Sequence, residues 1–216
     1  MMNSSNEYKR WFAFFSNLGS RTVPRTNKKI WMDLEEFVVL GTRYATENSR
    51  TFTSFIITCN KVAPILSPFK INKIAKKTLK NTEFNVLGYI ISNIQNHTRN
   101  PGQWNSLIKL SKKNMYNLET INLFGSKAFK IDTLFQEWNI DSSSLELGEI
   151  DKYLNSEKLL THRLIHQRLS GVKTVFSDIS FYRIFHEKTS LNQMAKDIFH
   201  DYRSVYQASE LLELVA

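Results

Sequence analysis

Residues 190–216, SLNQMAKDIFHDYRSVYQASELLELVA, decide the fold class because they are typical of two short helices joined by a tight turn. Apolar residues recur there at helical spacing in two groups: Leu191, Met194, Ala195 and Ile198, then Val205, Ala208, Leu211 and Leu212. Ser190 followed by Gln193 matches the S-x-x-Q capping box, which marks the start of a helix. Asp201 is a typical N-cap for the second helix.

The spacing of two residues predicts how these helices pack. Ala195 and Val205 lie ten residues apart, the separation between the small residue of the first helix of a helix-turn-helix and an apolar anchor in its second. The segment resembles the winged-helix domains of bacterial transcriptional regulators, whose pattern is roughly L-x-x-x-A-x-x-I-G-x-S-x-x-A-V-Y-x-A-L-x-x-L, and the resemblance covers about residues 157–216. Phe199 departs from it where the turn usually has glycine. The sequence also ends at Ala216, before the β-hairpin wing, so we expect a wing that is missing or truncated.

The resemblance implies double-stranded DNA as the partner, and a homodimer, because winged-helix regulators usually bind paired half-sites. The second helix would then enter the major groove with Tyr202, Arg203, Ser204, Tyr206 and Gln207. The first helix would contribute Ser190, Asn192 and Gln193.

The net charge of +9 is unevenly distributed along the chain. Lys61 to Lys113 contains ten basic residues and one acid, whereas residues 151–216 contain nine basic and eight acidic residues. Within SPFKINKIAKKTLK, apolar residues occupy one helical face, and we expect a lysine stripe along another: Lys70, Lys73, Lys76, Lys77 and Lys80. Because phosphate neutralisation supplies most non-specific DNA affinity, the stripe is predicted to contact the DNA backbone.

Composition favours a mostly α protein, since Gly (7) and Pro (4) are scarce and helical periodicity dominates. We expect an N-terminal helical domain over residues 1–138, a polar linker over 139–148 and a helix-turn-helix domain over 149–216. Helices are predicted at 8–18, 30–47, 51–63, 70–80, 82–96, 103–114 and within 149–171, with a short helix near 129–138.

The single cysteine, Cys59, excludes an internal disulfide and falls on an apolar helical face, so we expect a buried thiol in a reducing compartment. No apolar run approaches the roughly 18 residues that a membrane span needs. The predicted localisation is therefore cytoplasmic, without a membrane partner.

Catalytic and metal-binding patterns are weak. His162 and His166 have the spacing of a zincin pair, but Arg163 occupies the place of the glutamate, so we expect two solvent-side histidines and no metal. The sequence contains no Walker loop, no G-x-G-x-x-G and no C-x-x-C. We therefore expect no enzyme activity and no cofactor.

Three functions remain open at the level of sequence. The first is a DNA-binding transcriptional regulator that uses the helix-turn-helix together with the lysine stripe. The alternative is an antitoxin or defence-system subunit whose winged-helix-like module binds a protein partner, a toxin or another defence component, as the near-neutral charge around the motif would favour. The third is an RNA-associated or nuclease component, for which the sequence shows no signature.

Overall fold

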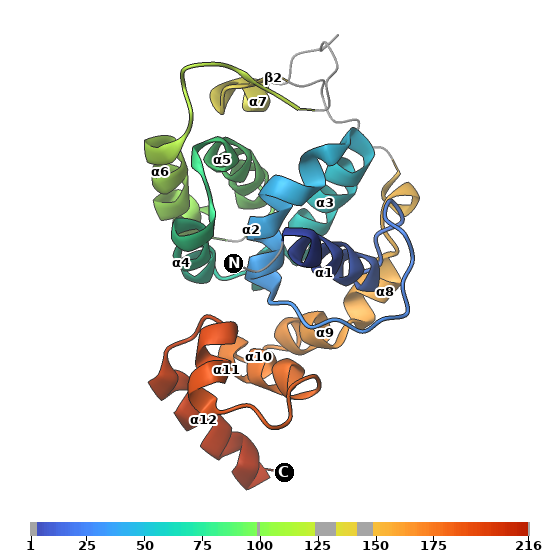
Figure 1. The fold of residues 1–216 in the computed structure, drawn as a ribbon, viewed down its shortest axis with the longest axis vertical. Coiled ribbons are helices and arrows are strands. Elements are labelled where there is room, and N and C mark those ends of the chain that lie inside the picture. Colours follow the sequence, from blue (N-terminus) through green and yellow to red (C-terminus); the bar gives the residue numbers. More distant parts are fainter. Residues whose placement is uncertain (1–3, 99, 124–132, 142–148, 216) are drawn as a thin grey trace.

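The computed structural model describes residues 4–98, 100–123, 133–141 and 149–215, and these are mostly helical, as the composition predicts (Figure 1). The first six helices are α1 (Ser4–Asn17), α2 (Leu34–Tyr44), α3 (Ser49–Val62), α4 (Pro68–Thr78), α5 (Asn81–Gln95) and α6 (Asn105–Asn114). Short 3-10 turns lie at Ala45–Glu47, Ala63–Ile65, Pro101–Trp104 and Ile150–Lys152. The remaining helices are α7 (Thr133–Glu137), α8 (Ser156–Thr161), α9 (Arg163–Leu169), α10 (Thr174–Arg183), α11 (Leu191–Asp197) and α12 (Tyr202–Val215).

Helices α1 to α9 surround one apolar core, and we call this part of the molecule the body. Its centre is aromatic: the Trp11 ring stacks on Phe37 with centroids 5.3 Å apart, and Phe55 packs against both. The Phe55 ring of α3 lies directly against Gly41 of α2, where a Cβ atom would be only 2.1 Å from it. Cys59 is buried in this core, as expected, and burial raises the pKa of its thiol.

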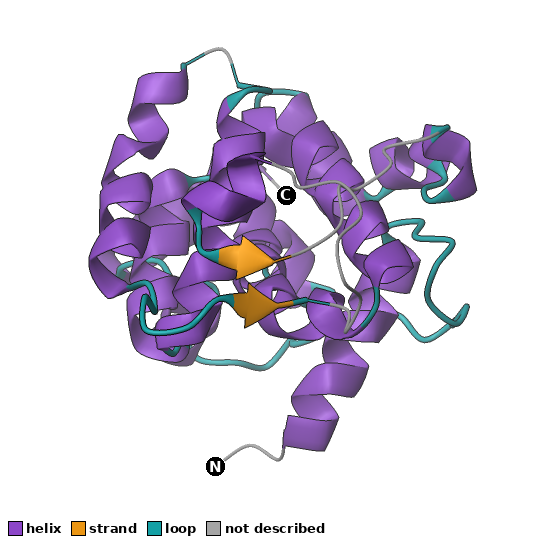
Figure 2. Ribbon diagram, turned by 90° about the horizontal axis from the view of Figure 1, so that it is seen from above, coloured by secondary structure: helices purple, strands orange, loops and turns teal. Residues whose placement is uncertain are grey.

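Two short parallel strands close the body on one side (Figure 2). Strand β1 (Ile121–Asn122) pairs with β2 (Ile140–Asp141), with Ile121 opposite Ile140. The predicted linker begins one residue before β2 and includes it, and Ile140 is buried in the body core. The linker's residues 142–148, like residues 129–132 of the predicted short helix, lie outside the described residues.

The single helix predicted within 149–171 is interrupted at His162, whose ψ of 123° is incompatible with a continuous helix. Helices α8 and α9 result, and their apolar residues Leu159, Leu164 and Ile165 pack into the body core. Both helices therefore pack with the body, although they lie within the segment 149–216 that the sequence predicts to form a helix-turn-helix domain.

Helices α10, α11 and α12 form a smaller unit with a core of its own, which we call the C-terminal module. Ala195 is buried in that core together with Val205, as the ten-residue spacing predicts. Both helix starts are capped as expected: the Gln193 N–H donates to Ser190 Oγ (3.3 Å), and the Ser204 N–H donates to Asp201 Oδ1 (2.9 Å). The module lies below the body in Figure 1.

The turn between α11 and α12 explains the departure at Phe199. This residue has φ of 58°, the left-handed conformation that glycine adopts without steric cost. The half-buried Phe199 ring packs against the body core, and this apolar contact offsets part of the cost of the left-handed backbone. Among the residues described, no helix is both long enough and apolar enough to span a bilayer.

Candidate nucleic-acid interface and the ionic cluster behind it

The C-terminal module is joined to the body by a group of charged side chains that we call the ionic cluster. Its members come from the start of α2, from α4, α9 and α10, and from the turn before α12: Asp33, Glu35, Lys70, Arg168, Asp178 and His200. The first five are at most 5% exposed. The cluster is therefore an interior feature that spans both parts of the molecule.

Arg168 links the body to the module within this cluster. Its Nη1 donates to Glu35 Oε1 (2.7 Å), and its Nη2 donates to Glu35 Oε2 (3.0 Å) and to Asp178 Oδ1 (2.6 Å). A guanidinium suits this task because its planar fork can bind a carboxylate with two parallel hydrogen bonds. Glu35 thus contacts α9, and Asp178 holds α10 to the same arginine.

Lys70 makes the second connection. Its ammonium donates to Asp178 Oδ2 (2.6 Å) and to Asp33, and it lies 3.6 Å from Glu35 Oε2. The ring of His200 approaches the same oxygen of Asp178 at 2.9 Å. Asp178 is consequently the centre of the cluster, with partners from α4, from α9 and from the turn before α12.

Burial and pairing act in opposite directions on the pKa of each carboxyl group. Burial raises the pKa of Glu35, but Arg168 and Lys70 outweigh it and bring that pKa down to about 2. The same balance, set by Lys70 and Arg168, holds the pKa of Asp178 below its usual range. For Asp33 burial dominates and the pKa is raised well above that range. The three carboxyl groups share only two cations, Lys70 and Arg168. Ionisation is therefore least favourable for one of the three, and that carboxyl is Asp33.

The placement of Lys70 corrects one prediction. Lys70 is 3% exposed and its ammonium is already paired with carboxylates, so it is unavailable to a DNA phosphate. The physical reason is helical geometry: Lys70 precedes Ile74 by four residues, and such residues share a face. The buried apolar face of α4 therefore carries Lys70 inward.

The remaining lysines of the stripe lie on the outer side of α4 or just after it. Lys73 is half-buried, and its Nζ donates to the carbonyl oxygen of Phe199 (3.0 Å), which places α4 against the turn before α12. Lys76, Lys77 and Lys80 are exposed. We call these three the exposed lysine stripe.

The side chains predicted to face the major groove lie along the first turns of α12. Tyr202 is 51% exposed and Tyr206 is 42% exposed, and Arg203 and Gln207 are also exposed. Ser204 is half-buried, and its hydroxyl donates to Asp201 Oδ2 (2.6 Å), so its side chain serves the helix cap.

The predicted contacts of the preceding helix lie at its exposed start. Ser190, Asn192 and Gln193 are all exposed. Ser190 acts as the N-cap, and the side-chain amide of Gln193 donates to Asp197 Oδ1 (2.8 Å). The structure places α4 against the turn between α11 and α12. Several of the predicted contact side chains already hydrogen-bond within the module.

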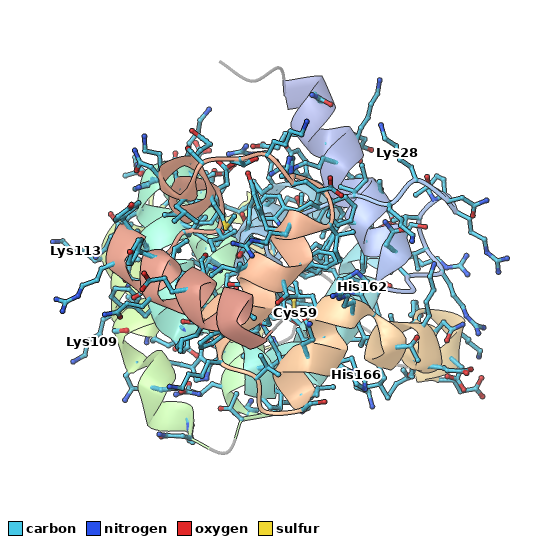
Figure 3. All side chains as sticks on the ribbon, turned by 90° about the horizontal axis from the view of Figure 1, so that it is seen from below. Lys28, Cys59, Lys109, Lys113, His162 and His166 are labelled. Atoms are coloured by element: carbon cyan, nitrogen blue, oxygen red, sulfur yellow. The ribbon has the colours of Figure 1, made fainter. Side chains whose placement is uncertain are left out.

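His162 differs from its prediction as a solvent-side residue. Its ring lies largely buried between Phe14 (centroids 5.6 Å apart) and Phe181 (5.2 Å), and burial lowers its pKa to about 4, with Lys158 adding to the effect. The turn between α8 and α9 positions it there. His166 is exposed on α9 as expected (Figure 3).

The ionic cluster was missed at the level of sequence, although a signal for it exists. Asp178 occurs on the apolar stripe of α10, with Ile179 beside it and Tyr182 one turn later. Arg168 follows Leu164 and Ile165 in the same way on α9. A charged residue on a buried stripe requires a buried partner, so such positions should be matched by opposite charge elsewhere.

Comparison with protein-family models, with curated proteins and with solved structures finds no match to this chain. Its function must therefore be inferred from the geometry of its own residues.

Proposed function

We propose that this protein binds double-stranded DNA as a transcriptional regulator, with α11 and α12 acting as a helix-turn-helix and α12 entering the major groove. The observation that carries the proposal is the hydrogen bond from Lys73 to the Phe199 carbonyl, because it places α4 beside the turn that leads into α12. Because the exposed lysine stripe begins on the same helix as Lys73, we expect it to border the end of α12 that carries Tyr202 and Arg203. A single DNA duplex could contact both.

The start of α12 and the exposed lysine stripe carry opposite charges, and this division suits sequence-specific DNA binding. The start of α12 carries the carboxylate of Asp201, whose pKa is lowered by hydrogen bonds from Ser204, and this anion disfavours a phosphate at the helix terminus. The exposed lysine stripe supplies the missing positive charge from α4. Side chains of α12 would contact base edges, while the lysines would hold the backbone without sequence preference.

The ionic cluster supports the same proposal by fixing the module's orientation. Groove recognition requires a helix held at a defined angle to the surface that contacts the backbone. Arg168 and Lys70 meet Asp178 from two different elements of the body, so α10 cannot rotate without breaking buried ion pairs. The chain acts in this proposal as a binding protein and not as an enzyme.

Neutralising part of the stripe tests the proposal. We expect Lys76→Ala with Lys77→Ala to weaken binding to random-sequence duplex DNA and to lower its salt slope by roughly 0.9 for each phosphate that is no longer neutralised. Salt-titrated fluorescence anisotropy with the full chain measures both quantities. Arg21→Ala with Arg25→Ala is the matched control, since both residues are exposed and remove the same charge from the segment between α1 and α2, away from α4. Equal effects of the two double variants would contradict the proposal.

A second measurement tests the major-groove assignment of α12. Arg203→Ala should cost about 1–3 kcal/mol on a sequence enriched from a random library by the full chain, with little change on unselected DNA, because the variant cannot hydrogen-bond a base edge. Lys196→Ala, on the exposed side of α11, controls for charge within the same module. A uniform decrease in affinity for both kinds of DNA would identify Arg203 as a phosphate-binding residue.

One observation favours the alternative, an antitoxin or defence-system subunit that binds a protein partner. The outer side of α12 exposes three large side chains, Tyr202, Tyr206 and Leu211, of which Leu211 is 52% exposed. Exposed aromatic and aliphatic groups are more typical of the centre of a protein interface than of a phosphate-contacting surface. Absence of duplex binding at low salt, with no response to the lysine variants, would favour this second function.

A further inference from the structure

A cleft on another side of the molecule is lined by basic and aromatic side chains that the proposed duplex binding does not use. It consists of two adjoining hollows of about 570 and 400 Å³ that share Lys29, Ile30 and Phe185. The walls come from α1, from the segment before α2, from the junction of α8 and α9, and from the end of α10 with the residues that follow it. We call these adjoining hollows the basic cleft, and its size is that of small-molecule sites.

The charge of the cleft is of one sign. Lys9, Arg10, Lys28 and Lys29 line the larger hollow, and Arg163 lines the smaller one, without an acidic residue in either lining. Arg10 is paired with Glu36, but Lys28 and Lys29 have no carboxylate partner among the described residues. Clefts walled by one sign of charge concentrate ions of the opposite sign, so the ligand is anionic.

The aromatic wall specifies a second property of the ligand. Trp31 lies edge-on to Tyr182 (centroids 5.0 Å apart) and to His186 (6.1 Å), and His186 in turn stacks on Tyr182 at 4.5 Å. Trp31 and His186 both line the larger hollow, and His186 is exposed. Such a wall accepts a planar aromatic ring by stacking.

We propose that the basic cleft binds a nucleotide unit, with its base against Trp31 and His186 and its phosphate at Lys28 and Lys29. The unit can come from a free mononucleotide or from a single strand. The proposal goes beyond duplex binding and does not depend on it, because the cleft shares no residue with the exposed lysine stripe or with α12.

Trp31 provides a direct readout. Trp11, Trp104 and Trp138 are fully buried, whereas Trp31 is half-buried at the cleft, so a bound base should quench its emission. The full chain is titrated with AMP, with adenosine, with inorganic phosphate and with a single-stranded pentadeoxyadenylate. We expect saturable quenching by a nucleotide, at least about tenfold weaker binding of adenosine, and no quenching by phosphate. Saturation by AMP assigns a free nucleotide, and saturation by the pentamer alone assigns a strand.

Matched variants complete the test. Lys28→Ala with Lys29→Ala should weaken nucleotide binding at least about tenfold, while Lys109→Ala with Lys113→Ala should leave it unchanged, since Figure 3 places that pair on the opposite side from Lys28. Calorimetry repeats the measurement without relying on fluorescence. Equal weakening by both pairs, or no saturable signal with any nucleotide, would overturn the proposal. Duplex affinity of the same variants separates this outcome from failure of the proposed DNA binding.

Discussion

The interior of the body and the junction between the body and the C-terminal module are both buried, but different forces hold them. The body is filled by aromatic and aliphatic side chains, with Trp11, Phe37 and Phe55 in mutual contact. The junction is filled by carboxylates and cations around Asp178. Apolar packing is non-directional, whereas ion pairs require particular partners at particular angles. The body can therefore tolerate small adjustments, while the junction defines one position of the module.

Substitutions in the body and at the junction should also destabilise the protein in different ways. Removal of an apolar group costs free energy in proportion to the buried area and volume that it filled, at any pH or salt concentration. Removal of one member of a buried ion pair leaves the other charge without compensation. Substitutions in the two regions can therefore be told apart, and the largest effect is expected at the junction.

Replacing the arginine of the ionic cluster should give the largest loss of stability. Arg168→Met keeps an unbranched side chain but leaves Glu35 and Asp178 short of one cation, so we expect the free energy of unfolding to fall by about 3–5 kcal/mol. Urea denaturation followed by circular dichroism measures it. Lys112→Met, which removes an exposed ion pair with Glu137, is the control and should cost no more than about 1 kcal/mol.

The same variant should change the response to acid. Because Arg168 and Lys70 lower the pKa of Glu35 to about 2, its charge stabilises the folded protein fully above its ordinary pKa, and this stabilisation is lost as pH falls towards 2. In Arg168→Met the pKa of Glu35 should lie closer to its ordinary value, so Glu35 should contribute less to the fall in stability at acid pH. An unchanged pH profile of the unfolding free energy would show that Glu35 and Arg168 are not coupled.

Overpacking the body should give an intermediate and pH-independent effect. In Gly41→Ala the new methyl group would lie 2.1 Å from the Phe55 ring, whose side chain is fully buried, so we expect the free energy of unfolding to fall by about 1–3 kcal/mol. Gly102→Ala is the matched control, because its nearest neighbour would be 3.7 Å away. Thermal denaturation at several pH values measures the loss of stability in Gly41→Ala. A loss that varies with pH, as expected for Arg168→Met, would contradict the distinction between apolar and ionic packing.

The smallest effect concerns the turn where the two regions meet. Phe199→Gly and Phe199→Ala both remove the ring, but only alanine retains the steric cost of a φ near 58°. We therefore expect the glycine variant to be more stable than the alanine variant by about 1 kcal/mol. Equal melting temperatures would mean that the turn relaxes once the aromatic ring is absent.

Most helices could be predicted from the sequence, whereas the breaks and contacts between helices could not. The positions of Ala195 and Val205 and the caps at Ser190 and Asp201 are local features, and the structure confirms them. The interruption at His162 could not be predicted from periodicity, because apolar residues continue in register across it. Its cause is tertiary, since the ring packs between Phe14 and Phe181.

The candidate site shows the same division. Exposure of Lys76, Lys77 and Lys80 follows from their distance to the apolar face of α4, and that part was predictable. The inward position of Lys70 follows from the same helical geometry, but its partners Asp33 and Asp178 lie 37 and 108 residues away along the chain and could not be identified from the sequence. No local pattern identifies which distant carboxylate will neutralise a given lysine. The basic cleft was missed for a similar reason, because its walls come from four separated segments.

The sequence separations within the ionic cluster have a consequence for the order of folding. Arg168 meets Glu35 across 133 residues, so the charges at the start of α2 remain hydrated until α9 has been synthesised and has docked. Contacts of such long range form slowly, because a large loop must close before they can form. The apolar parts of the body can collapse earlier, but the start of α2 and the inner face of α4 reach their final packing only when α10 arrives. We therefore expect completion of the body to depend on synthesis of the C-terminal module, and the two parts to fold as one cooperative unit.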